Sequence, residues 1–152
     1  MSKIAVFPGS FDPITIGHEK IVVRGAQLFD EVVVAVGENS QKNYLHDLEY
    51  RMKQIEKVFE NFSNIRVDSY TGLTIEYCKS INARYILRGL RTAADFEYER
   101  TIGVLNMTMQ KEIETIFLIS QPEYSAVSST MVREIMKHGG NANPFLPKAL
   151  HQ

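Results

Sequence analysis

Short apolar segments alternate with longer amphipathic segments along the whole chain. Runs rich in β-branched residues predict strands at residues 4–7, 31–36, 65–69, 84–87 and 115–119. Apolar residues at helical spacing predict helices near residues 17–29, 48–62, 73–82, 93–110 and 129–138. The strand runs lack polar alternation, as expected for strands buried on both faces. The pattern predicts one α/β domain over residues 1–152: a Rossmann-like, doubly wound sheet of five parallel strands with helices on both faces.

Capping residues support these helix positions. Asp47 precedes the second helix, Thr71 the third, and Ser128 or Ser129 the fifth, which should stop at Gly139–Gly140. In parallel sheets of this kind, ligands bind outside the carboxyl ends of the strands. Candidate chemistry is therefore expected in the loops that lead from each strand into the next helix.

Composition narrows the class of protein. The 17 basic and 18 acidic residues give a formal net charge of −1, which argues against a protein that coats nucleic acid. The only cysteine, Cys78, excludes an internal disulfide and a cysteine zinc site. The apolar runs are too short to span a membrane, and the N-terminus does not resemble a signal peptide. We expect a cytoplasmic protein without nucleic-acid or membrane partners.

The loop after the first strand, PGSFDPITIGH, is the first candidate for chemistry. Gly9 allows close backbone approach, Ser10 offers a hydroxyl, and Gly17 and His18 fall at a helix N-terminus, where anions bind. The alternative is a tight turn with His18 as a polar residue at the helix start. Two prolines, two glycines, an aspartate and a histidine in eleven residues favour a functional loop.

Basic residues follow two further strands. Lys42 lies in the loop after the second strand, where its ammonium could reach a phosphate or could simply be solvated. Arg88 and Arg91 flank Gly89-Leu90 at the end of the fourth strand and could clamp phosphate oxygens. Arg91, Asp95 and Glu99 are also spaced for a ladder of surface ion pairs, which competes with a functional role for Asp95.

The segment after the fifth strand carries a run of hydroxyl residues. Capping the following helix needs one of Ser128, Ser129 and Thr130, which leaves two spare donors beside free backbone N–H groups. Tyr124 could cover a purine ring or pack on the sheet. Three loops suited to anions at one sheet edge predict a site for a nucleotide with its phosphate chain.

The segments PGSFDPITIGH, RGLRTAADFEYE and YSAVSSTMVRE together resemble the bacterial phosphopantetheine adenylyltransferases. Thr15-Ile16-Gly17-His18 alone matches the wider T/HxGH nucleotidyltransferase superfamily, and the other two segments are more specific. The match extends over nearly the whole chain, with Ser10 where threonine is common and Tyr124 where tryptophan is frequent. The resemblance implies Mg²⁺-dependent transfer of the adenylyl group of ATP to 4′-phosphopantetheine, giving dephospho-coenzyme A and pyrophosphate.

By matching position, the resemblance also implies residue roles. His18 would stabilise the transition state at the α-phosphate, with Lys42 and Arg91 as further catalytic residues. The acceptor would contact Ser10, Lys42, Thr74 and Arg88. ATP would contact Ser10, Phe11, His18, Gly89, Leu90, Arg91, Glu99, Tyr124, Ser125, Ala126, Val127, Ser128, Ser129 and Thr130. The family typically forms homohexamers and is inhibited by coenzyme A.

The acceptor phosphate is itself a nucleophile, so no activated side chain is required. We expect positioning and electrostatic stabilisation without a covalent intermediate, and Mg²⁺ held by ATP phosphates rather than by protein side chains. Two alternatives are a related nucleotidyltransferase with another phosphate acceptor and a non-catalytic nucleotide-binding module. Residues 102–109 carry more apolar side chains than one helix face needs, which indicates either core or a subunit interface.

Overall fold

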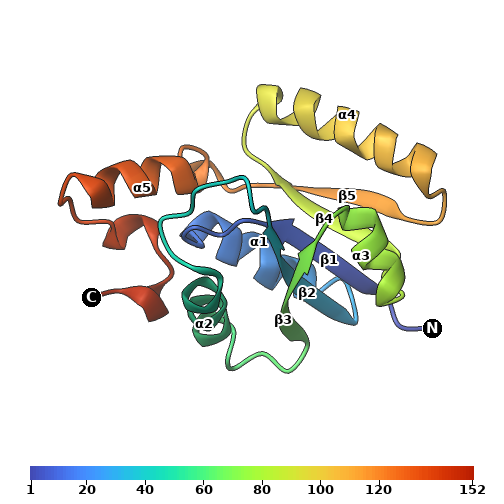
Figure 1. The fold of residues 1–152 in the computed structure, drawn as a ribbon, viewed down its shortest axis with the longest axis horizontal. Coiled ribbons are helices and arrows are strands. Elements are labelled where there is room, and N and C mark those ends of the chain that lie inside the picture. Colours follow the sequence, from blue (N-terminus) through green and yellow to red (C-terminus); the bar gives the residue numbers. More distant parts are fainter.

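The computed structural model describes residues 1–152, and its centre is one five-stranded parallel sheet (Figure 1). The strand order is β3-β2-β1-β4-β5. The strands are β1 (Ile4–Gly9), β2 (Glu31–Glu38), β3 (Ile65–Thr71), β4 (Tyr85–Leu90) and β5 (Glu114–Ile119). The main helices are α1 (Ile16–Ala26), α2 (Leu48–Val58), α3 (Thr74–Ser80), α4 (Ala93–Met109) and α5 (Ser129–Lys137). The predicted α/β, doubly wound parallel sheet is confirmed.

Two apolar clusters show how helices cover both faces of the sheet. Val22 of α1, Ile55 of α2 and Val132 of α5 belong to one cluster. Ile75 and Cys78 of α3 belong to the other. The chain changes face after β3, where α3 crosses to β4 on the far side of β1. This reversal places the carboxyl ends of β1 and β4 side by side, at the point where doubly wound sheets bind ligands.

The inner strands β1 and β2 are more buried than the edge strands β3 and β5. Residues Val32–Val36 of β2 are fully buried, as the continuous apolar run predicts. In β3, Arg66 is exposed, and in β5 both Glu114 and Ile119 are exposed. The prediction that all five strands are buried on both faces was therefore wrong for the edge strands, which have a neighbour on one side only.

Three short 3₁₀ helices, at Pro122–Tyr124, Asn143–Phe145 and Lys148–Leu150, were not predicted. The predicted caps Asp47 and Ser128 are confirmed, because their side chains accept from Tyr50 N–H and Met131 N–H. The Thr71 cap was wrong. Thr71 still pairs with Glu38 in the sheet, and the chain turns at Gly72, with φ 81°, before the helix begins. No helix is long and apolar enough to cross a membrane.

Candidate active site

The loop from β1 to α1 brings His18 to the edge of the sheet. Thr15 caps α1, and the two residues form a reciprocal capping box. The Thr15 hydroxyl accepts from His18 N–H at 3.3 Å, and Thr15 N–H donates to His18 Nδ1 at 3.0 Å. Because Nδ1 is the acceptor, the ring proton lies on Nε2. The capping box therefore fixes both the ring and its tautomer.

His18 is neutral in this setting. Burial, with the positive charges of Arg88 and Arg91 as smaller causes, lowers the pKa of His18 from 6.5 to about 3. The Phe11 ring packs edge-on against the imidazole, with ring centroids 5.1 Å apart. His18 thus presents an Nε2–H donor, rather than a cation, to any anion at this edge.

Gly9 and Phe11 shape the same loop. Phe11 is buried and has a left-handed φ of 49°, which turns its ring under the loop. A Cβ at Gly9 would meet that ring at 2.9 Å, so glycine is required there. The Phe11 side chain packs against the His18 ring and does not line either of the two cavities at this edge of the sheet. The expected contact of Phe11 with ATP stays a prediction.

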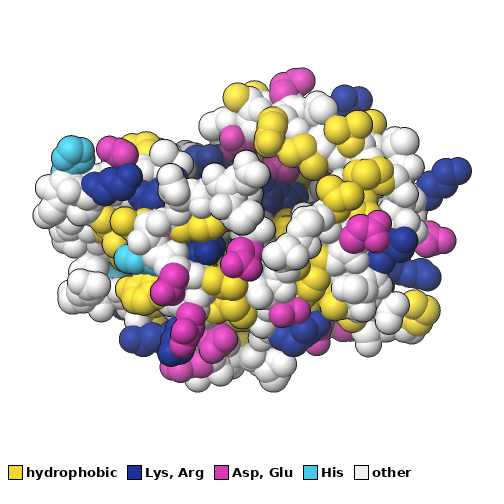
Figure 2. Space-filling view, viewed as in Figure 1, with side chains coloured by type: hydrophobic (Ala, Val, Ile, Leu, Met, Phe, Trp, Pro, Cys, Tyr) yellow, Lys and Arg dark blue, Asp and Glu magenta, His cyan; other side chains and the backbone are white.

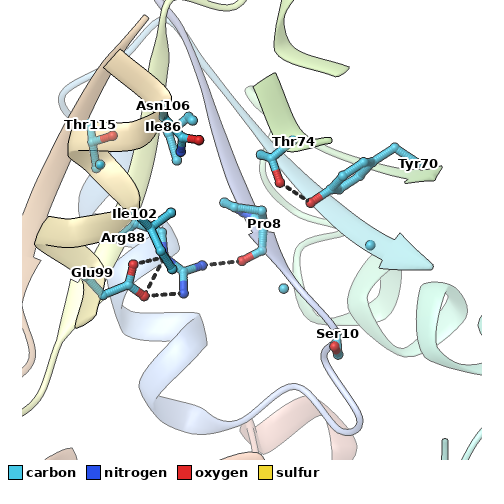
Figure 3. A pocket seen from close by; sticks show the side chains of 13 residues that line it. Pro8, Ser10, Tyr70, Thr74, Ile86, Arg88, Glu99, Ile102, Asn106 and Thr115 are labelled. Atoms are coloured by element: carbon cyan, nitrogen blue, oxygen red, sulfur yellow. Dashed lines mark hydrogen bonds and ion pairs between the residues drawn. The ribbon is translucent and has the colours of Figure 1, made fainter. Parts of the chain in front are cut away.

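Arg88 at the end of β4 is held by two anchors. Its Nε and Nη2 donate to the Glu99 carboxylate, and its Nη1 donates to the Pro8 carbonyl at 2.6 Å. Figure 3 shows this arrangement. Since a guanidinium carries five N–H groups, one N–H on each of Nη1 and Nη2 is left for a ligand. Glu99, expected from the resemblance to contact ATP, is here the partner that fixes Arg88.

The expected ladder along one helix face forms only in part. Arg91 Nε lies 3.5 Å from Asp95 Oδ2, and Arg91 N–H donates to the same oxygen at 3.0 Å. Glu99 pairs with Arg88 instead of joining this ladder, because Arg91 precedes α4 and does not lie on its face. Arg88 is therefore paired with Glu99, and Arg91 with Asp95.

Lys42 meets Ser10 across the carboxyl edges of β2 and β1. Lys42 Nζ donates to Ser10 Oγ at 3.1 Å, although the two residues are far apart in sequence. Lys42 is exposed, as the alternative of a solvated lysine expects, but its ammonium also has a specific partner beside the Gly9 loop. Asp12 tethers the same two loops, since its carboxylate accepts from Leu45 N–H and His46 N–H.

Each hydroxyl at the start of α5 has a partner, but only Ser129 donates, so two O–H donors remain, on Ser128 and Thr130. Ser128 caps the helix, Ser129 Oγ donates to the Pro13 carbonyl at 2.8 Å, and Thr130 Oγ accepts from Arg133. These contacts fasten the start of α5 to the β1–α1 loop. Ser128 uses its oxygen as the cap acceptor, so its O–H remains available to a ligand.

Two cavities meet at this edge. The larger, of about 460 Å³, is lined by His18, Gly89, Arg91, Val127, Ser128 and Ser129 among others. The smaller, of about 270 Å³, lies between α3 and α4 and includes Tyr70, Thr74, Ile86, Ile102 and Asn106 (Figure 3). Both are lined by Pro8, Gly9, Ser10, Arg88 and Glu99. The space-filling view shows the hollow below α4, with basic side chains inside it (Figure 2).

Several predicted contacts lie outside the cavity walls: Phe11, Lys42, Leu90, Tyr124, Ser125, Ala126 and Thr130. Lys42 lies beside the wall through its bond to Ser10, and a Cβ at Gly17 would lie 3.9 Å from the Tyr124 Cβ. The Ser125 hydroxyl is turned to the Pro122 carbonyl at 2.8 Å.

Sequence reasoning missed much of the smaller cavity. Tyr70 hydrogen-bonds Thr74 at 2.7 Å and stacks on Tyr77, and neither tyrosine was singled out. Asn106 and Gly103 line the same wall as Glu99. Their spacing of three and four residues places them on one helix face, and this was the signal available.

The apolar excess in residues 102–109 is largely solvent-facing. Val104, Leu105, Met107 and Met109 are exposed, and Glu99 is the only buried residue of α4. Hydrophobic side chains accordingly gather on the surface over α4 (Figure 2). The core alternative for this stretch was wrong, because these side chains point away from the sheet.

Several known proteins are similar to this chain in sequence or in fold. The cytidylyltransferase-like family model matches residues 6–135. A phosphopantetheine adenylyltransferase of Cytophaga hutchinsonii is 46% identical over 147 residues, which cover 97% of this chain and 98% of that protein. One from Leptospira biflexa is 50% identical over 147 residues, or 97% and 92% of the two chains. A solved bifunctional NMN adenylyltransferase/ADP ribose pyrophosphatase from Francisella tularensis has a TM-score of 0.74 at 14% identity, covering 96% of this chain and 45% of that one, and so shares the fold alone.

The fold, the anion-suited sheet edge and the family match define a nucleotidyltransferase of the cytidylyltransferase-like class. Within that class, the chain belongs to the phosphopantetheine adenylyltransferase family. The resemblance drawn from the three sequence motifs is confirmed.

Proposed function

We propose that this protein transfers the adenylyl group of ATP to 4′-phosphopantetheine and releases dephospho-coenzyme A and pyrophosphate. One observation carries the proposal beyond the family match. Two cavities open from a shared wall that holds Ser10, Arg88 and Glu99. Such a wall lets two substrates meet with their phosphates in contact while their remaining parts occupy separate spaces.

The larger cavity is assigned to ATP. It contains the His18 donor, Arg91 and the Ser128 hydroxyl at the start of α5. The segment from Tyr124 to Thr130 and the strand end Gly89–Leu90 form or adjoin its rim. Helix N-termini and arginine donors suit the phosphate chain, and the surrounding backbone suits the nucleoside.

The smaller cavity is assigned to the pantetheine arm. Its walls combine apolar Ile86 and Ile102 with the polar groups of Asn106, Thr74 and Tyr70. An uncharged chain of amides and methylenes fits such a mixed surface. The acceptor phosphate would then lie at the shared wall, which holds Ser10 and Arg88, and Lys42 Nζ reaches this wall through its bond to Ser10 Oγ.

The chemistry needs no covalent intermediate. The acceptor phosphate oxygen attacks the α-phosphorus of ATP, a new P–O bond forms, and the bond to pyrophosphate breaks. His18 Nε2–H donates to the α-phosphate as negative charge grows there, and Arg91 and Lys42 stabilise the same charge. Because the capping box holds the imidazole before substrate arrives, little reorganisation accompanies the reaction.

Mg²⁺ belongs to the ATP phosphate chain in this proposal. The carboxylates that line the larger cavity, Asp95 and Glu99, already accept arginine N–H groups and so do not form a cage. Bound to ATP, the ion would neutralise phosphate charge. In this proposal the protein side chains bind the two substrates, and Mg²⁺ is bound by the phosphates of ATP.

We also place this enzyme in the cytoplasm as a homohexamer that coenzyme A inhibits from the substrate site. The exposed apolar face of α4, formed by Val104, Leu105, Met107 and Met109, supports self-association. Coenzyme A carries both the pantetheine arm and an adenosine, so it can occupy both cavities at once. It would therefore compete with both substrates.

Acceptor selection tests the proposed function. Purified protein with ATP and Mg²⁺ is assayed for pyrophosphate release with 4′-phosphopantetheine, and in parallel with nicotinamide mononucleotide or glycerol phosphate. We expect release with 4′-phosphopantetheine alone. Release with another acceptor would replace the substrate, and no release with bound ATP would favour a non-catalytic nucleotide-binding module.

A further inference from the structure

Arg51 of α2 is a buried cation that lines neither cavity. Its side chain belongs to the fully buried set, with 1% of the residue exposed. It makes no ion pair with any carboxylate. Burying an arginine without an anion is costly, and an apolar side chain would fill the same space at lower cost. Packing alone therefore does not explain this residue.

The contacts of Arg51 all lie in the two loops that carry Ser10 and Lys42. Nη1 donates to the Ser10 carbonyl at 2.7 Å, and Nε donates to the His46 carbonyl at 3.0 Å. The guanidinium thus links the loop after β1 with the loop after β2. Arg51 binds the backbone carbonyl of Ser10, while Lys42 binds the Ser10 hydroxyl.

Tyr44 gives Arg51 a second route to Lys42. The Arg51 guanidinium carbon lies 4.0 Å from the centre of the Tyr44 ring, and Lys42 Nζ lies 5.6 Å from the same centre. The Tyr44 hydroxyl also accepts from Asn39 N–H at 3.0 Å, which fixes the ring within the loop. Arg51, Tyr44, Lys42 and Ser10 therefore form a closed ring of contacts.

We propose that Arg51 is a positioning residue for the acceptor phosphate: through Ser10 and Tyr44 it sets the placement of the Lys42 ammonium. The inference rests on the proposed function, in which Lys42 and Ser10 bind that phosphate. Without Arg51, the two loops lose their common anchor and the ammonium samples more positions. Acceptor binding then weakens, while the ATP contacts at His18, Arg91 and Ser128 stay in place.

Four variants test this role: Arg51→Met, Arg51→Lys, Tyr44→Leu and Tyr44→Phe. Lys53→Met is the matched control, because Lys53 lies on the same helix and pairs only with Glu49 at the surface. For each, kcat and the KM values for 4′-phosphopantetheine and ATP are measured separately. We expect Arg51→Met to raise the acceptor KM about tenfold, the size of one lost charge-assisted contact, with ATP KM unchanged. Arg51→Lys should fall between Arg51→Met and wild type, and Tyr44→Phe should stay closer to wild type than Tyr44→Leu.

A double variant separates positioning from simple stabilisation. If Arg51 acts through Lys42, Arg51→Met should raise the acceptor KM much less in a Lys42→Met background than in the wild-type background. A residue that only stabilises the fold would lower the amount of active enzyme and leave both KM values unchanged. Additive effects in the double variant, or an unchanged acceptor KM in Arg51→Met, would overturn the proposal.

Two further outcomes are distinguishable. If Arg51→Met does not fold, Arg51→Lys and the loop variant Tyr44→Leu decide, and a wild-type acceptor KM in both contradicts the proposal. If the wild-type protein itself does not use 4′-phosphopantetheine, the proposed function fails before any variant is compared. Failure of the positioning role appears only as a difference between variants of an active enzyme.

Discussion

The backbone N–H of Thr15 donates to Nδ1 of His18 at 3.0 Å, while the Thr15 hydroxyl accepts from the backbone N–H of His18. A capping box normally uses a glutamate or glutamine at the position of His18. With histidine there, the same contact that starts the helix also decides which ring nitrogen carries a proton. Helix capping and the orientation of the proposed transition-state donor are thus one structural feature.

Loss of this donor should affect turnover more than ATP binding. We expect His18→Ala to lower kcat by about 100-fold or more, the usual cost of removing one preorganised donor to a developing oxyanion. ATP affinity, measured by calorimetry, should change much less, because Arg91 and the start of α5 remain. Nearly intact turnover in this variant would remove His18 from the mechanism.

Acid should destabilise the protein through His18. The folded pKa is about 3, below the 6.5 of the unfolded chain, so the unfolded state binds a proton first as pH falls. This contribution to stability is complete above pH 6.5 and is lost progressively as pH falls toward 3. Urea unfolding at about pH 7.5 and about pH 5 should show a larger loss for wild type than for His18→Asn. Equal losses would show that the pKa of His18 is the same in the folded and the unfolded protein.

The pairing of Arg88 with Glu99 predicts a defect on the acceptor side. Glu99→Gln keeps the shape but removes the charge that holds Nε and Nη2 of Arg88. We expect acceptor affinity to fall by about 1.5 kcal/mol, roughly tenfold, in line with loss of a charged hydrogen bond. Separate KM values for the two substrates provide the measurement. An increase in ATP KM alone would instead support the direct ATP contact that the resemblance implied for Glu99.

The assignment of the two cavities can be tested by filling one of them. Gly103 lines the smaller cavity, where an added Cβ would lie 3.6 Å from the nearest atom, Thr115 Oγ1. Gly103→Leu should therefore fold and should raise the acceptor KM by about tenfold or more by occupying the arm's space. Val104→Leu, at the exposed neighbouring position, is the control and should behave as wild type. An unchanged acceptor KM in Gly103→Leu would place the arm elsewhere.

The outer face of α4 predicts an oligomer contact. Leu105 is 57% exposed, and Met109, one turn further along the same helix face, is exposed as well. Leu105→Glu would put a charge into a contact between copies and should shift the protein to smaller species in sedimentation velocity. Lys57→Glu, at an exposed position of α2, is the control. A monomeric wild-type protein would contradict the proposed homohexamer.

Much of the fold follows from the apolar pattern, and the site follows in part from its motifs. The first four strands were predicted too short at their carboxyl ends, because residues such as Gly9, Glu38 and Leu90 pair through the backbone whatever their side chains are. Asp47 and Ser128 were recognisable as caps because their bonds span only three residues.

Long-range partners were not predictable in this way. Arg88 is recognisable as a basic residue at a strand end, but its anchors Glu99 and Pro8 lie 11 and 80 residues away in sequence. Arg51 reaches Ser10 across 41 residues and looks like an ordinary basic residue of an amphipathic helix. A single sequence carries no signal for such contacts, since they depend on which loops the sheet topology brings together.

The stereochemical course at the α-phosphorus distinguishes direct attack by the acceptor phosphate from a covalent adenylyl-enzyme. The substrate would be ATP in which sulfur replaces one non-bridging oxygen of the α-phosphate, with a single configuration at phosphorus. After turnover with 4′-phosphopantetheine, the configuration at that phosphorus in the product would be determined. Direct attack by the acceptor phosphate is a single in-line displacement and predicts inversion. Retention would mean two displacements through an adenylyl group bound to the enzyme, and would contradict an active site that works by positioning two substrates against each other.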